Sequence, residues 1–98
     1  MKKYYRISIF KNNRVGEILA GLAAKSNGGQ YMTLPELAAV AKAEQITYPT
    51  LCGEFTAELI GDSLLHIDAK TGADTYETVL SIEEVEVFEL EGGAAMAD

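Results

Sequence analysis

The spacing of apolar residues changes along this chain, and that change constrains the fold more than any other feature of the sequence. Between about residues 15 and 45 the apolar positions recur every three or four residues, as they do on one face of an α-helix. From residue 55 onward they alternate with polar positions, which is typical of a half-buried β-strand. A chain of 98 residues that carries both patterns is expected to form one domain of the α+β class.

Two helices are predicted in the first half of the chain. The first covers residues 14–25, and the glycines of the segment SNGG end it. The second begins at Thr33, because Thr33 and Glu36 have the spacing of a capping box and Pro35 suits a first helical turn. The apolar residues expected to face the core are Val15, Ile18, Leu19, Leu22, Leu34, Leu37, Ala38 and Ala41.

Strands are predicted near both ends of the chain. Residues 2–10 are rich in β-branched and aromatic residues, and residues 75–80 and 85–90 have a similar composition, separated by a short break at 81–84. The first strand is basic and the last is acidic. We expect them to be neighbours, because opposite charges across a strand pair stabilise it modestly.

Residues 50–60 fit two different structures. As a helix, the segment places apolar residues at every fourth position; as a strand, Phe55, Ala57 and Leu59 alternate with polar residues. The strand is favoured, because Gly53 would weaken a helix interior. The segment IGDS that follows is also typical of a hairpin turn between two alternating runs.

The expected fold is a small single α+β domain, an antiparallel sheet of four or five strands with two helices packed on one face. It would occupy residues 1–91, with a flexible tail at 92–98. A winged helix-turn-helix is the alternative. Residues 15–80 resemble that family in their apolar spacing, with residues 47–60 as the recognition helix and the hairpin 64–80 as the wing.

The charges of this region argue against a DNA-reading function. Lys and Arg neutralise DNA phosphates, and base edges are read chiefly by Arg, Lys, Asn and Gln. Residues 47–60 contain none of these four residue types but do contain Glu54 and Glu58. The supposed wing offers Lys70 alone, between two aspartates. We therefore expect no direct contact with nucleic acid.

No group of residues predicts catalysis, a cofactor or a metal ion. His66 and Cys52 are the strongest candidates for acid–base or nucleophilic chemistry, but no third residue can be nominated to orient them. Asp68 and Asp74 share a predicted loop that lacks the spacing and the glutamate of a calcium-binding loop. The chain is therefore expected not to be an enzyme and to bind no cofactor or metal.

Charge is distributed unevenly along the chain, which carries a net charge of −7. Residues 1–49 hold seven basic and three acidic side chains, a balance of +4, whereas residues 50–98 hold one basic and twelve acidic side chains, a balance of −11. Such asymmetry can indicate a surface for a partner of opposite charge. The other explanation is a solvated acidic face whose charges keep sheet edges from aggregating.

We expect the acidic half to dock on a basic protein and to inhibit or regulate it, because opposed potentials speed association and select partners. In composition the chain is similar to small acidic immunity proteins and to phage-encoded inhibitors that imitate nucleic acid, which implies binding without catalysis. A winged-helix DNA-binding transcriptional regulator is the alternative function. The expected partner-binding residues are Glu77, Glu83, Glu84, Glu86, Glu89, Asp68 and Asp74.

The sequence favours a soluble cytoplasmic protein. No segment approaches the roughly 18 consecutive apolar residues of a membrane span, and the basic N-terminus is not followed by the apolar run of a signal peptide. A single cysteine suits a reducing compartment. Monomer and homodimer both remain open.

Overall fold

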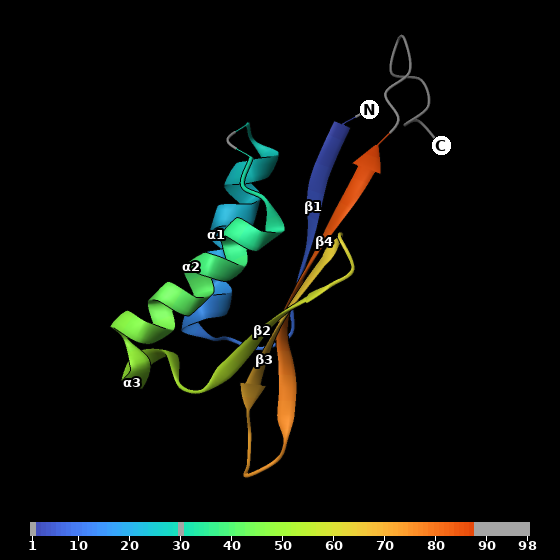
Figure 1. The fold of residues 1–98 in the computed structure, drawn as a ribbon. Coiled ribbons are helices and arrows are strands. Elements are labelled where there is room, and N and C mark those ends of the chain that lie inside the picture. Colours follow the sequence, from blue (N-terminus) through green and yellow to red (C-terminus); the bar gives the residue numbers. More distant parts are fainter. Residues whose placement is uncertain (1, 30, 88–98) are drawn as a thin grey trace.

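The computed structural model describes residues 2–29 and 31–87, which form a four-stranded antiparallel sheet with its helices on one face (Figure 1). This arrangement confirms the predicted α+β class and the two main helices on one face of the sheet. Within the described residues, no helix is long and apolar enough to cross a membrane. In chain order the elements are β1 (Lys2–Ile9), α1 (Arg14–Asn27), α2 (Leu34–Thr47), α3 (Pro49–Cys52), β2 (Phe55–Ile60), β3 (Leu64–Lys70) and β4 (Tyr76–Val87).

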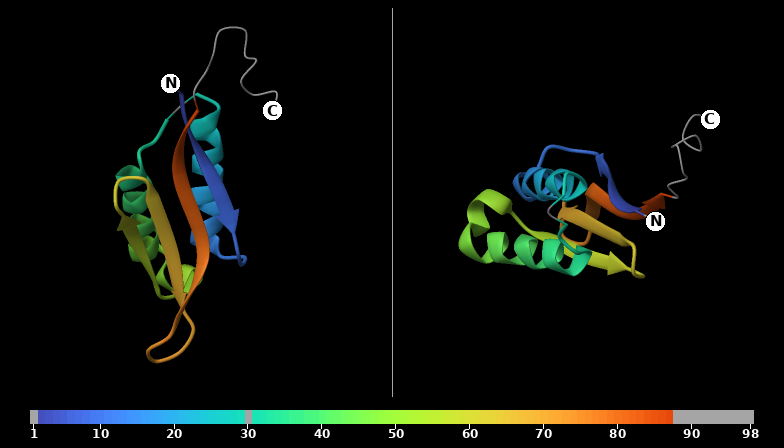
Figure 2. Two further views of the ribbon diagram at one scale, coloured as in Figure 1. Left: turned by 90° about the vertical axis from the view of Figure 1, so that its right-hand side faces the viewer. Right: turned by 90° about the horizontal axis from the view of Figure 1, so that it is seen from above.

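The strands lie in the order β1-β4-β3-β2, and each neighbouring pair is antiparallel. The predicted pairing of the first and last strands is confirmed, since β1 pairs with β4 from Lys2 opposite Val87 to Ile9 opposite Leu80. Strands β2 and β3 form the predicted hairpin, and Gly61 in its turn has a φ of +61°, which favours glycine. The left view of Figure 2 shows the sheet face-on with the helices behind it.

Local hydrogen bonds explain where the two long helices begin. The side chain of Asn13 accepts from the backbone N–H groups of Val15 and Gly16 at 2.9 and 3.2 Å, which starts α1. The predicted capping box starts α2. Thr33 accepts from the backbone N–H of Glu36, and the Glu36 carboxylate accepts from the backbone N–H of Thr33.

The core lies between the helices and the sheet. From the helices it takes Val15, Leu19 and Leu37, and from the sheet it takes residues such as Ile67 and Ile82, all with no exposed surface. Burying one aliphatic side chain of this size contributes about 1.5–3 kcal/mol relative to leaving it exposed. The predicted hairpin alternation holds in β3, where the alternate residues Leu65 and Ile67 are both fully buried in this core.

The predicted break at residues 81–84 is wrong, because β4 runs without interruption from Tyr76 to Val87. Ser81 lies in the middle of the sheet, opposite Ser8 on one side and His66 on the other. Pairing with β1 on one side and β3 on the other thus keeps residues 81–84 in the strand, although three of these four residues are polar. A bulge does occur nearby, where Val79 is the extra residue of β4.

The winged-helix alternative is also wrong. Of residues 47–60, only Pro49–Cys52 form a separate short helix, and Gly53 then turns the chain with a φ of +69° before β2 begins. A long recognition helix is therefore absent from this segment. Residues 88–98 lie outside the described part of the chain. This range includes the predicted end of the last strand and of the domain, at 88–91, and the predicted tail at 92–98.

Candidate functional site

The face of the sheet that points away from the helices is uncovered, and we call it the open face (Figure 2). Its residues pair with one another in the sheet register and alternate with residues that face the helices. No side chain among them is buried. The open face includes Tyr4, Arg6, Ser8, Thr56, Glu58, Ile60, Leu64, His66, Asp68, Thr78, Ser81, Glu83 and Val85.

A shallow hollow of about 360 Å³ lies at the margin of the open face, which contributes His66, Thr78 and Ser81 to its lining. The Phe10 ring, which is 60% exposed, forms its apolar wall. Next to it, the hydroxyl of Thr78 donates to the Asp68 carboxylate at 2.6 Å. The lining residues are Phe10, His66, Glu77, Thr78 and Ser81.

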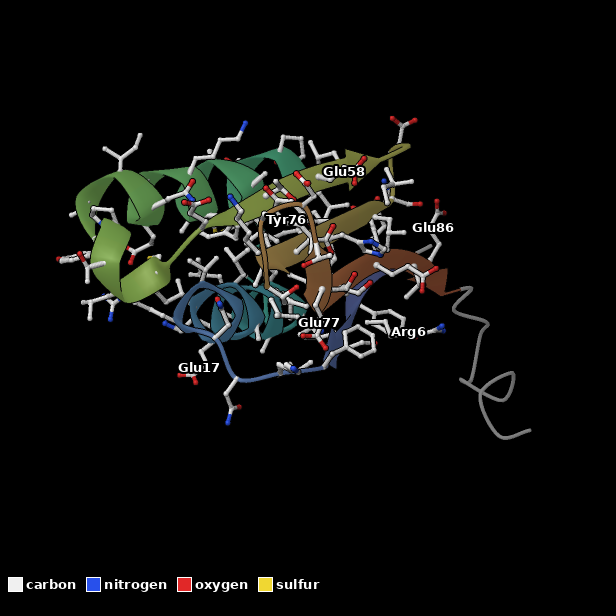
Figure 3. The ribbon with its side chains drawn as sticks, turned by 90° about the horizontal axis from the view of Figure 1, so that it is seen from below. Arg6, Glu17, Glu58, Tyr76, Glu77 and Glu86 are labelled. Atoms are coloured by element: carbon white, nitrogen blue, oxygen red, sulfur yellow. The ribbon has the colours of Figure 1, made fainter. Side chains whose placement is uncertain are left out.

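This lining combines an aromatic ring, a carboxylate, two hydroxyls and an imidazole, which suits a positively charged side chain. A guanidinium can stack on an aromatic face while it donates hydrogen bonds to a carboxylate. The Glu77 carboxylate already lies 2.8 Å from the ammonium of Lys11, in a partly exposed pair that exchanges readily with solvent. Figure 3 shows Glu77 and Tyr76 on the same part of β4.

Several of the predicted partner-binding acids are engaged within the chain itself. Glu83 lies 3.4 Å from Arg6, and Glu84 lies 3.8 Å from Lys3. Both ion pairs join β1 to β4, so basic residues of the first strand do balance acidic residues of the last one. Surface pairs of this kind stabilise a protein by at most about 1 kcal/mol each.

Glu84 has a structural environment that the sequence did not indicate. Its side chain is only 19% exposed and accepts a hydrogen bond from the hydroxyl of Tyr31. The Tyr31 ring stacks on that of Tyr5, with ring centroids 5.0 Å apart, and the Tyr5 hydroxyl donates to the carbonyl oxygen of Met32. Burial, followed by the hydrogen bond to Glu84, raises the pKa of Tyr31 well above its ordinary value, and burial raises that of Tyr5.

The predicted acids do not form one surface. Asp68 and Glu83 lie together on the open face, where Glu58 joins them although it was not predicted. The rest are dispersed: Glu77 lines the hollow, Glu84 points to the helix side, Asp74 lies in the β3–β4 turn, Glu86 lies near the end of β4, and Glu89 is outside the described residues.

The unpaired charges of the described residues differ between the two layers: the sheet and its turns carry unpaired acids, whereas the helices carry Glu17 and Glu36 as well as two lysines without an ion pair. Among the described side chains, five acids of the second half make no ion pair, whereas the unpaired lysines Lys25 and Lys42 belong to the helices. Lys70 of β3 is paired with Glu54 at 3.1 Å, and that hydrogen bond raises the pKa of Lys70. The five acids are Glu58, Asp62, Asp68, Asp74 and Glu86.

The two candidate catalytic residues lie on opposite sides of the sheet. Cys52 is buried in α3, with its sulfur 3.4 Å from the carbonyl oxygen of Glu44, whereas His66 is on the open face. They cannot act as a pair. Within residues 2–29 and 31–87, no cluster of three or more His, Cys, Asp or Glu side chains is placed to hold a metal ion.

No known protein family, curated protein or solved structure matches this chain at a significant level of similarity. The open face and its charges are therefore the basis for a functional assignment.

Proposed function

We propose that this protein binds a basic protein partner through the open face and inhibits or regulates that partner without catalysis. The observation that carries the proposal is the pair of carboxylates Glu58 and Asp68. They lie on adjacent strands of an uncovered sheet, and neither forms an ion pair with another described side chain.

The placement of these two carboxylates favours a cationic partner. In the register of the hairpin, Glu58 is opposite His66 and Asp68 is opposite Thr56, so the two acids are diagonal neighbours. Such neighbours lie about 7–8 Å apart, close enough for both to contact one Lys or Arg side chain of a partner. Charge-assisted hydrogen bonds of this kind are roughly twice as strong as neutral ones.

Apolar surface beside the acids suits a protein rather than a free cation. Tyr4, Leu64 and Val85 are half-buried on the open face, and Ile60 is 42% exposed there. Protein interfaces commonly combine an apolar centre with a polar rim, and they are enriched in aromatic residues and in Arg. The hollow beside Phe10 would receive an arginine at the margin of such an interface.

The proposal is tested by affinity capture from native lysate at low and at high salt, with the full chain as bait. We expect a basic protein to be recovered at low salt and lost at high salt, because screening weakens attraction between exposed charges. Two charge-matched variants are compared with the wild type: Glu58→Lys on the open face and Glu17→Lys on α1. Figure 3 shows Glu17 projecting from α1 away from the sheet.

Glu58→Lys is expected to weaken capture of the basic protein about tenfold or more, an effect of roughly 1.4 kcal/mol. Glu17→Lys should leave capture close to that of the wild type, because it makes the same change in net charge on the other layer. Equal losses in the two variants would show that only net charge matters. That result, or recovery of nucleic acid in place of a basic protein, would contradict the proposal.

A further inference from the structure

Each edge of the sheet has backbone groups that point away from the neighbouring strand. On β1 the described hydrogen bonds satisfy those of Tyr5 but not those of Ile7. Strand β1 forms one edge, and there the side-chain amide of Asn27 bonds both the N–H and the carbonyl oxygen of Tyr5. Strand β2 forms the other edge. An unprotected edge strand is a ready template for pairing with another chain.

Strand β2 directs the backbone groups of Ala57 and Leu59 outward. The N–H of Lys70 donates to the carbonyl oxygen of Glu54 at 3.0 Å, so these two residues face each other as a hydrogen-bonded pair. Hydrogen-bonded and non-bonded pairs alternate along an antiparallel ladder. Every second residue of β2 from Phe55 onward therefore points its N–H and carbonyl away from β3.

Those outward groups lack partners over most of the strand. Gln45 approaches the carbonyl oxygen of Phe55 at 3.5 Å, which is long for a hydrogen bond. Among the described residues, no hydrogen bond reaches the outward groups of Ala57 or Leu59. Leu59 is also 43% exposed, so apolar side-chain surface accompanies the free backbone groups.

The flank of α2 above this edge is exposed and carries apolar residues beside Lys42. Glu44 contacts Arg14 of α1, and Gln45 reaches β2. Successive helical residues are about 100° apart, so Ile46 points to the remaining flank, on the side of the β2 edge. Ile46 is 81% exposed. Pro35, Ala39 and Lys42 have the spacing to share this flank, and all three are exposed.

We propose that a second copy of the chain pairs with β2 in an antiparallel arrangement, with Ala57 opposite Ala57 of the second copy across a two-fold axis. In this register Leu59 is opposite Phe55 of the other copy, and Glu58 is opposite Thr56. Three outward-facing pairs then form, which supply about six backbone hydrogen bonds. The exposed flanks of the two α2 helices approach each other above the junction.

Neighbouring registers are less favourable, because they bring like charges together and form fewer backbone hydrogen bonds. A two-fold axis at Glu58 would place this carboxylate opposite its own copy, and like charges directly opposite destabilise a strand pair. An axis at Thr56 would place Glu58 opposite Glu54 of the second copy. Both of these registers form only about four backbone hydrogen bonds, because they align two outward-facing pairs instead of three.

The dimer would join the two sheets into one sheet of eight strands, four from each copy. The open faces become continuous, and Glu58 and Asp68 of both copies gather around the two-fold axis. The acidic surface of the proposed function would thus be completed by the second copy. The dimer itself does not depend on that function.

The first test is sedimentation of the full chain from about 1 to 500 µM, where an interface of modest area is expected to show a reversible dimer. Because each copy carries a net charge of −7, salt should strengthen the dimer by screening repulsion. Salt should weaken capture of a basic partner, so the two proposals can fail separately. A monomer at every concentration and salt would overturn the dimer.

Disulfide trapping tests the register. Ala57→Cys places a thiol opposite its own copy, and we expect rapid crosslinking under mild oxidation. Leu59→Cys is the matched control, since the two introduced thiols would lie four residues apart along the strands and should crosslink at least tenfold more slowly. The native Cys52 is buried and is present in both variants. Equal crosslinking of the two variants would contradict the register.

A surface variant tests the edge without a thiol. Leu59→Lys adds a charge of the kind that protects natural edge strands, and it is expected to weaken dimerisation at least tenfold. Ile9→Lys makes the same change on β1, where Ile9 is 56% exposed, and should leave dimerisation unchanged. If Ile9→Lys abolished the dimer and Leu59→Lys did not, the second copy would lie at the other edge and the inference would be wrong.

Discussion

The side-chain amide of Asn27 donates to the carbonyl oxygen of Tyr5 at 2.9 Å and accepts from its backbone N–H at 2.6 Å. At the middle of β1, a single side chain from the end of α1 thereby forms the two backbone hydrogen bonds that a neighbouring strand would form. Both partners are backbone groups that an edge strand would otherwise leave to solvent or to another chain. The contact joins the helix layer to the sheet and satisfies the outward backbone groups of β1 at Tyr5.

Asn27→Ala should destabilise the fold by about 1–3 kcal/mol, because two hydrogen bonds are lost and the backbone groups of Tyr5 are left partly buried. Amide hydrogen exchange at Tyr5 should accelerate more than exchange elsewhere in β1. Denaturant unfolding and exchange measured by NMR would check both effects. Asn12→Ala, in the exposed loop before α1, is the control. Unchanged exchange at Tyr5 would contradict the role of Asn27.

Tyr31→Phe should make the protein less sensitive to alkali. The pKa of Tyr31 is raised in the folded state, so the unfolded chain loses the phenolic proton first as the pH rises. The contribution of Tyr31 to stability is complete below the ordinary tyrosine pKa of about 10 and is lost progressively above it. The wild type should therefore lose more free energy of unfolding than Tyr31→Phe between about pH 8 and about pH 11.

The control for that experiment is Tyr76→Phe, since Tyr76 is 49% exposed and lies on β4 away from the Tyr5–Tyr31 stack. It should retain the alkaline sensitivity of the wild type. If both variants behaved alike, the sensitivity would not come from the environment of Tyr31.

Glu36→Gln should remove an acid-sensitive contribution to stability. Hydrogen bonds from the backbone and the side chain of Thr33 lower the pKa of Glu36. A carboxyl group whose pKa is lower in the folded state stabilises the protein when the pH is above the pKa of the unfolded state. This contribution is lost as the pH falls through the pKa of the folded state. The wild type should exceed Glu36→Gln in stability near pH 7, and the difference should shrink toward about pH 3.

Thr33→Ala is the companion variant for the same cap. It should lower the free energy of unfolding by about 1 kcal/mol, because the cap of α2 loses its side-chain acceptor. Urea unfolding measures both variants. A difference between the wild type and Glu36→Gln that stayed constant with pH would be evidence against the capping carboxylate as its source.

Ile67→Ala should destabilise the protein by about 2–5 kcal/mol, because Ile67 has no exposed surface and its removal leaves a cavity under the helices. Ile60→Ala provides the matched control on the open face, where Ile60 is 42% exposed, and should cost less than about 1 kcal/mol. If chemical unfolding showed similar losses of unfolding free energy for the two variants, Ile67 and Ile60 would not be on opposite faces of the hairpin.

Local sequence patterns predicted most of the secondary structure. The capping box of Thr33 and Glu36 joins residues only three positions apart, so its hydrogen bonds depend on little beyond α2 itself. The alternation in residues 55–60 and the next run correctly predicted a hairpin. By contrast, the polar segment 81–84 was predicted as a break, because its position between two neighbouring strands cannot be read from composition.

The candidate site was less predictable. Acids that are adjacent in sequence, such as Glu83 and Glu84, point to opposite faces of a strand, so their number alone did not define a surface. Glu84 is held by Tyr31, 53 residues earlier in the chain. Glu58 was not chosen from the sequence, and only the pairing of β2 with β3 places it beside Asp68 on the open face.

The sequence by itself therefore determined the helices, the hairpin and the uneven charge, since these depend on residues within a few positions of one another. The tertiary structure decided which acids are paired, where Asn27 bonds the edge strand β1 and which face is uncovered. These features depend on contacts between residues far apart in the chain, and such contacts exist only after the strands have taken their order β1-β4-β3-β2.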